Sequence, residues 1–134
     1  MRTRAAWLFL ALTGLVIGYH LCLILGAPWG RLTAGGHWPG VLPLAGRALS
    51  VASIAILLLV ARVVAEAAGL VRARLPGWSG RAALIWLSLG AVMNALTPSA
   101  AERALWLPVI LVMLACAWAA GASDLPPQNP APPG

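Results

Sequence analysis

The chain has few charges of either sign and no lysine. Its 134 residues include three acids, Glu66, Glu102 and Asp124, and nine basic residues, all of which are arginine. Only 9% of the residues are charged and 61% are hydrophobic, whereas a soluble domain has about 25% charged and about 45–50% apolar residues. An aqueous fold would lack the polar surface that keeps it dispersed. The composition therefore predicts an integral membrane protein.

Motifs of common enzymes are also absent from the sequence. It contains no glycine-rich phosphate loop, no H-E-x-x-H and no G-x-S-x-G, and Glu66 has no second acid beside it for paired-carboxylate catalysis. Cys22 and Cys116 lie in separate apolar segments without C-x-x-C spacing, so we interpret them as packing residues. We expect no cofactor and no resident metal, and the sequence favours a protein that is not an enzyme.

The formal charge of +6 raises the question of nucleic acid as a partner. The arginines are scattered at the ends of apolar segments, and they do not cluster with polar and aromatic residues on one soluble face. We therefore exclude nucleic acid and interpret the arginines as determinants of topology and as contacts to anionic lipids of the inner leaflet.

Four apolar segments predict an all-α fold, a transmembrane four-helix bundle. A spanning helix needs roughly 20 residues, and the third segment is marginal by this measure but is needed to connect its neighbours. The first segment is longer than the apolar run of a signal peptide and lacks a cleavage site, so we expect it to remain attached. The predicted helices cover about residues 5–26, 47–70, 82–97 and 100–121, and a disordered proline-rich tail follows at 122–134.

The distribution of arginine predicts the orientation. One side would hold Arg2, Arg4, Arg72, Arg74 and Arg81, and the other would hold Arg31, Arg47 and Arg103. The larger group predicts that both termini face the cytoplasm.

The first connection, residues 26–47, then faces outward. It is rich in glycine and proline and carries four further candidate residues, Trp29, Arg31, His37 and Trp38. The two tryptophans can anchor the connection at the headgroup level. We expect it either to cap the bundle or to bind a ligand.

Small residues predict which helix faces make contact, because helices in lipid associate through close backbone approach. Spacings of three and four connect the following residues: Trp7, Ala11, Gly14, Gly18, Leu21 and Leu25 in the first helix; Ala48, Ala52, Ala55, Leu59, Arg62, Glu66 and Gly69 in the second; Ala83, Leu87, Gly90, Asn94 and Thr97 in the third. These stripes place Arg62, Glu66 and Asn94 toward the interior.

Arg62 and Glu66 are adjacent on one helical face. With a helix that ends at residue 70, they lie roughly 12 Å and roughly 6 Å inside that end. The pair is either a structural anchor that reaches the interface, a proton or ion relay or counter-charge, or a contact to another subunit.

Tyr19 and His20 form a second polar group near the outer end of the first helix. Ser50, Ser53 and Asn94 lie at the same depth. If Gly18 is buried, His20 lies on a flank of the helix, where we expect a satisfied interfacial histidine. His37 could join it in a metal or haem site, but two histidines are few for such a site.

The third connection carries a helix start, in which Ser99 and Glu102 fit a capping box. Pro98, directly before it, suits a sharp end of the third helix. The fourth helix should begin near Ala100.

Three short motifs resemble those of a group of small, uncharacterised bacterial four-helix integral membrane proteins. They are G-A-P-W-G at residues 26–30, G-G-H-W-P-G-V-L-P at 35–43 and P-S-A-A-E-R at 98–103. In this group an acid often follows P-W-G, where this chain has Arg31. The resemblance implies a multi-pass protein of the bacterial inner membrane and no particular activity.

Three functions remain open at this point. The first is a non-catalytic accessory or structural component, with a homo-oligomer or another membrane protein as partner. The second is a small transporter or channel that uses Arg62 and Glu66. The third is a membrane enzyme or a haem or metal protein that uses His20 and His37.

Overall fold

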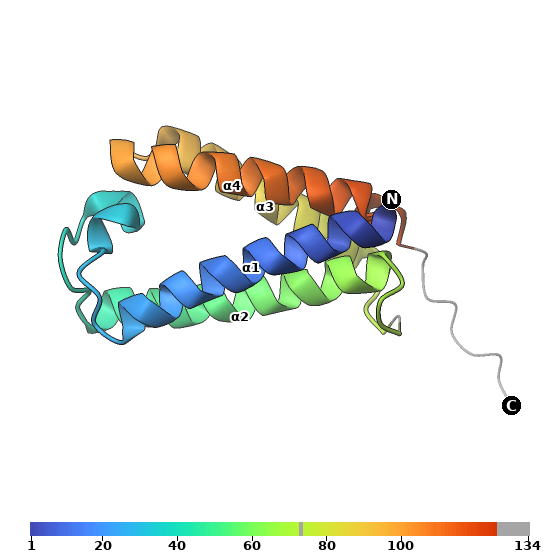
Figure 1. The fold of residues 1–134 in the computed structure, drawn as a ribbon, viewed down its shortest axis with the longest axis horizontal. Helices are drawn as coiled ribbons and strands as arrows, with labels where there is room; N and C mark the ends of the chain where they lie inside the picture. The colour runs from blue at the N-terminus through green and yellow to red at the C-terminus, as the bar shows by residue number, and fades with distance from the viewer. Residues whose placement is uncertain (73, 126–134) are drawn as a thin grey trace, which may run out of the picture.

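Four long helices run antiparallel to their sequence neighbours and form a bundle (Figure 1). The computed structural model describes residues 1–72 and 74–125. Each helix is long and apolar enough to cross a membrane, and its ends lie within about one turn of the predicted segment. The chain is therefore a multi-pass membrane protein with an all-α fold, as predicted. The helices are α1 (Arg2–Ile24), α2 (Leu44–Ala67), α3 (Trp78–Leu96) and α4 (Ala100–Ala119).

The helices are arranged as two hairpins, α1 with α2 and α3 with α4. The helices contact each other most extensively within each hairpin, α1 also packs on α4, and α2 contacts α3 less. The hairpins are close together at the end that holds the N-terminus, which we call the terminal end, and they diverge toward the opposite end (Figure 1). Residues 26–43, which we call the cap, lie at this opposite cap end and include the short 3₁₀ helices η1 (Gly30–Leu32) and η2 (Ala34–Gly36).

The predicted small-residue stripe of α1 is wrong. Trp7 is 61% exposed and Leu25 is 85% exposed, and a Cβ added at Gly14 or Gly18 would meet nothing within 4 Å. The helix instead turns the opposite stripe inward, where Phe9 fills the core. Residues of this stripe follow spacings of three and four and are buried or partly buried: Ala6, Phe9, Thr13, Val16, His20 and Leu23.

The predicted stripe of α2 is also mostly exposed, whereas the predicted stripe of α3 does face inward. Ala48, Ala52, Ala55 and Leu59 are exposed, whereas Glu66 is buried as predicted. The inward stripe of α2 contains Gly46, Ser50, Ser53, Leu57, Val60 and Val64. In α3 the predicted residues Ala83, Leu87 and Thr97 are buried, and Gly90 lies so close to Ile110 of α4 that a Cβ there would be 2.5 Å from it.

The segment after α4 is ordered where we predict the start of a disordered tail. Residues Ala122–Asp124 form the 3₁₀ helix η3. Ala122 is completely buried against Gly80 at the start of α3, and Asp124 pairs with Arg2 at 3.0 Å. The remainder of the predicted tail, 126–134, lies outside the described residues.

Candidate functional site

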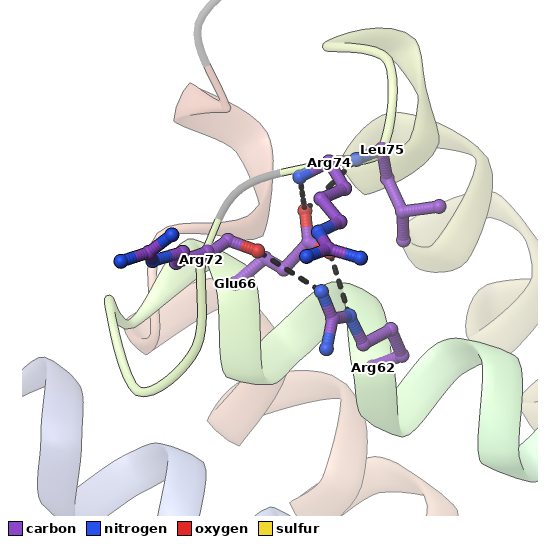
Figure 2. Close-up of polar contacts among 5 residues, drawn as sticks. All are labelled: Arg62, Glu66, Arg72, Arg74 and Leu75. Atoms are coloured by element: carbon purple, nitrogen blue, oxygen red, sulfur yellow. Dashed lines mark hydrogen bonds and ion pairs between the residues drawn. The ribbon is translucent and has the colours of Figure 1, made fainter.

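Arg62 and Glu66 form an ion pair at the terminal end of α2 (Figure 2). The Nε atom of Arg62 donates to Oε1 of Glu66 at 2.7 Å. The other carboxylate oxygen, Oε2, accepts from the backbone N–H groups of Arg74 and Leu75 at 2.9 and 3.0 Å. Nη2 of Arg62 donates to the carbonyl oxygen of Arg72 at 2.9 Å. Both side chains therefore hold the connection between α2 and α3 in place.

This pair lies nearer the helix end than the sequence predicts. Because α2 ends at Ala67, Arg62 lies about 7.5 Å and Glu66 about 1.5 Å from that end. The side chain of Glu66 is fully buried, whereas that of Arg62 is 40% exposed. Glu66 thus lies at the end of α2 and accepts hydrogen bonds from the backbone that follows the helix, while Arg62 reaches the surface. The geometry favours the structural anchor among the three interpretations.

A second group of polar side chains lines a cavity of about 240 Å³ in the cap-end half of the bundle. His20 comes from α1, Ser53 from α2, Asn94 from α3, and Glu102 and Trp106 from α4. Thr33 of the cap and Tyr19 of α1 complete the polar lining. The structure therefore brings together Tyr19, His20, Ser53 and Asn94, which the sequence places at a common depth.

His20 lies in the interior because α1 turns its glycine stripe outward. It belongs to the inward stripe of α1 and lines the cavity, so the expected position on a flank of the helix is wrong. Its Nδ1 atom is buried and has no hydrogen-bond partner. Within the described part of the chain this ring nitrogen thus has no partner, contrary to the expectation of a satisfied side chain.

Three hydrogen bonds from side chains to the backbone of the cap hold it over this cavity. Trp106 Nε1 donates to the carbonyl oxygen of Leu32 at 2.7 Å, and Ser99 Oγ donates to that of Arg31 at 2.8 Å. The hydroxyl group of Tyr19 donates to the carbonyl oxygen of Trp29 at 3.2 Å. Two of these donors belong to the second hairpin, although the cap is part of the connection within the first hairpin.

The tryptophans of the cap have different positions. The ring of Trp29 stacks on Tyr19 with 6.3 Å between centroids and is 45% exposed. Trp38 lies against α2 at Gly46, where an added Cβ would be 3.1 Å from its ring. Trp29 thus contacts Tyr19, which lines the cavity, and Trp38 fastens the cap to α2.

His37 does not join His20 at the cavity. It is exposed, packs on Trp38, and lines a different cavity of about 500 Å³ at the cap end. Within residues 1–72 and 74–125, no group of three or more His, Cys, Asp or Glu side chains is placed to hold a metal ion. The geometry thus gives the pair of histidines no shared site.

Glu102 is the functional candidate that sequence reasoning assigned to a helix start alone. That assignment is half right, since Ser99 Oγ accepts from the Glu102 N–H at 3.2 Å. The carboxylate does not return to Ser99; its Oε2 accepts from Thr97 Oγ1 at 2.9 Å. Glu102 lines both the 240 Å³ and the 500 Å³ cavities. Its spacing of four from Trp106, on the same helical face, is the signal that could have placed it there.

Comparisons with known protein families, with curated proteins and with solved structures find no match to this chain.

Proposed function

We propose that this protein is a non-catalytic membrane component that binds a small ligand in the cavity between its two hairpins. One observation carries the proposal: polar side chains from all four helices and from the cap meet at a single cavity. Placing polar groups inside a membrane protein is costly, and a bundle held by packing alone does not require them. Binding also fits the role of an accessory component better than that of an enzyme.

A transport pathway through Arg62 and Glu66 has less support. Both oxygens of Glu66 already accept hydrogen bonds, so a proton or ion would have to displace the connection between α2 and α3. The cavity lies in the other half of the bundle. The motifs of the cap and of the third connection resemble those of small bacterial membrane proteins, which supports the bacterial inner membrane as the location.

The test is the accessibility of the cavity to a charged thiol reagent that does not cross membranes. The Asn94→Cys substitution is made in a background in which Cys22 and Cys116 are replaced by alanine, and labelling is followed in sealed vesicles. We expect the reagent to react from the cap-end side of the membrane.

The Ala95→Cys variant is the matched control. Ala95 is exposed on the outside of the bundle and lies one residue nearer the cap end of α3 than Asn94 does. If depth in the membrane alone governed labelling, Ala95→Cys would react at least as fast as Asn94→Cys. We expect Asn94→Cys to react at least about tenfold faster, because lipid excludes a charged reagent. Equal rates, or no labelling of Asn94→Cys, would contradict an accessible binding cavity.

A further inference from the structure

We propose that the ligand of this cavity is a small organic cation with N–H donors, a primary or secondary ammonium, and that Glu102 is its counter-charge. This inference rests on the proposed function and specifies the class of its ligand.

The first argument is the charge of Glu102. The described residues contain two ion pairs, Arg2 with Asp124 and Arg62 with Glu66, and neither involves Glu102. The neighbouring Arg103 directs its Nη1 atom to the carbonyl oxygen of Thr97 at 2.8 Å. The carboxylate of Glu102 therefore faces the cavity with no cation of the described chain beside it. A ligand with a positive charge would supply the missing partner.

The second argument is that four of the side chains that line the cavity already use an N–H or O–H group within the protein. Tyr19 and Trp106 donate to backbone carbonyls of the cap. Ser53 Oγ donates to the carbonyl oxygen of Leu49 at 2.9 Å, and Asn94 Nδ2 donates to that of Gly90 at 2.8 Å. The N–H and O–H groups in these four bonds are thus not available to an incoming ligand.

The acceptors that line the same cavity remain available. Within the described residues, Oε1 of Glu102 and Oδ1 of Asn94 take part in no hydrogen bond. Nδ1 of His20 is buried without a partner, and a neutral imidazole offers one ring nitrogen as an acceptor. A cavity that offers acceptors and one negative charge is complementary to a cationic donor. The charge of Glu102 makes the cavity poorly suited to an anion.

The third argument is the aromatic lining. Tyr19 and Trp106 meet edge to face with 4.7 Å between ring centroids, and Trp86 lines the same cavity. Aromatic rings attract cations through their faces, and tryptophan does so most strongly. The volume of about 240 Å³ is below the roughly 300–1,000 Å³ of pockets for drug-sized ligands, so this cavity by itself holds only a small cation.

The 500 Å³ cavity adjoins this site. It shares Asn94 and Glu102 with the smaller cavity and extends to His37 and Pro98 at the cap end. Glu102 and Asn94 therefore lie between the surface and the interior, where an arriving cation would meet the carboxylate first.

The test measures binding to the whole protein in nanodiscs of zwitterionic lipid by isothermal titration calorimetry, with empty nanodiscs as the blank. The probes are n-butylammonium, n-butanol, butyrate and tetramethylammonium. We expect saturable binding of n-butylammonium, weaker binding of tetramethylammonium, which has no N–H donor, and no measurable binding of n-butanol or butyrate. This selectivity is measured on the unmodified protein, so the test does not depend on whether a variant folds.

Two variants locate the counter-charge. Glu102→Gln should weaken n-butylammonium binding at least about tenfold, because a hydrogen bond to a charged group is lost. Asp124→Asn removes the same charge at the terminal end and should leave the affinity unchanged. Equal binding of n-butylammonium and n-butanol, no binding of any probe, or a Glu102→Gln affinity equal to that of the unmodified protein would overturn the proposal. If Asn94→Cys is labelled while n-butylammonium fails to bind, the cavity stands and only the cationic class is wrong.

Discussion

Glu66 and Glu102 both lie in the terminal turn of a helix, but their carboxylates have different partners. Glu66 accepts three hydrogen bonds, one of them from an arginine, with both oxygens in use. Glu102 accepts one through its side chain, from Thr97. A buried carboxylate with every oxygen occupied holds structure together, whereas one with a free oxygen at a cavity is able to bind. The number of donors around each acid thus distinguishes their roles.

Replacement of Glu66 should destabilise the protein. In the Glu66→Gln variant at least one of the three donors would face an amide N–H₂ group instead of an oxygen. Loss of a hydrogen bond to a charged group costs about 1.5–3 kcal/mol. We expect the free energy of unfolding in detergent to fall by this amount. Thermal or denaturant unfolding in detergent micelles measures it.

Asp124→Asn is the control for this prediction, because its pair with Arg2 is roughly 60% exposed on both sides. Exposed pairs contribute about 0–1 kcal/mol. A Glu66→Gln protein as stable as the control, with altered ion flux in vesicles, would count for the relay and against the anchor.

At the scale of elements, the cap depends on a close approach of its own backbone. Gly30 is buried, and its N–H donates to the carbonyl oxygen of Gly40 at 3.0 Å. A Cβ at Gly30 would overlap the carbonyl oxygen of Trp38, whereas a Cβ at Gly40 would meet nothing within 4 Å. The two glycines of this hydrogen bond therefore differ in what they tolerate.

We expect Gly30→Ala to loosen the cap and Gly40→Ala to leave it intact. Overpacking of this kind costs about 1–3 kcal/mol. Limited trypsin digestion is the measurement, since Arg31 in η1 is exposed and becomes cleavable when the cap opens. Identical digestion of the two variants would contradict the closed arrangement of the cap.

The helices could be predicted from the sequence, but two of their inward faces could not. Hydropathy and length define a span well, and Pro98 together with Ser99 defined the end of α3 and the start of α4. Small residues predicted the face of α3, where Gly90 does meet Ile110. They failed for α1, because a small residue can face lipid as readily as a neighbouring helix. In α1 the inward face is the one that carries Phe9, Thr13 and His20.

Only part of the candidate site could be predicted from the sequence. The common depth of Tyr19, His20, Ser53 and Asn94 follows from counting residues along helices, and the cavity brings these four together. Glu102 was missed because its backbone role at the helix start explained its presence. Which oxygen of a carboxylate remains free depends on tertiary contacts that a linear pattern does not contain.

At the scale of the whole molecule, the distribution of charge predicts the orientation. Arg62 reaches the terminal end through its bond to Arg72, so it joins the arginines already predicted for that side. The terminal end then carries Arg2, Arg4, Arg62, Arg72, Arg74 and Arg81, and the cap end carries Arg31, Arg47 and Arg103.

We expect a C-terminal green fluorescent protein fusion to be fluorescent and a C-terminal alkaline phosphatase fusion to be inactive in a bacterial host, since positive loops stay in the cytoplasm. Replacing Arg72, Arg74 and Arg81 with alanine should yield a mixed orientation. The backbone groups that bond to Arg62 and Glu66 persist in this variant, so its effect reports on charge. The reverse fusion activities in the unmodified chain would show that the cap faces the cytoplasm.

The hydrogen bonds of the cap to Ser99 and Trp106 have a consequence for biogenesis. The cap leaves the ribosome before α3 and α4, yet two of its carbonyl oxygens find their donors on the second hairpin. During synthesis the cap of the first hairpin is therefore held only by its contacts to α1 and α2, and His20 and Ser53 are not yet covered by the second hairpin. Only insertion of α4 completes the lining, so the cavity comes into being after α4 has entered the membrane.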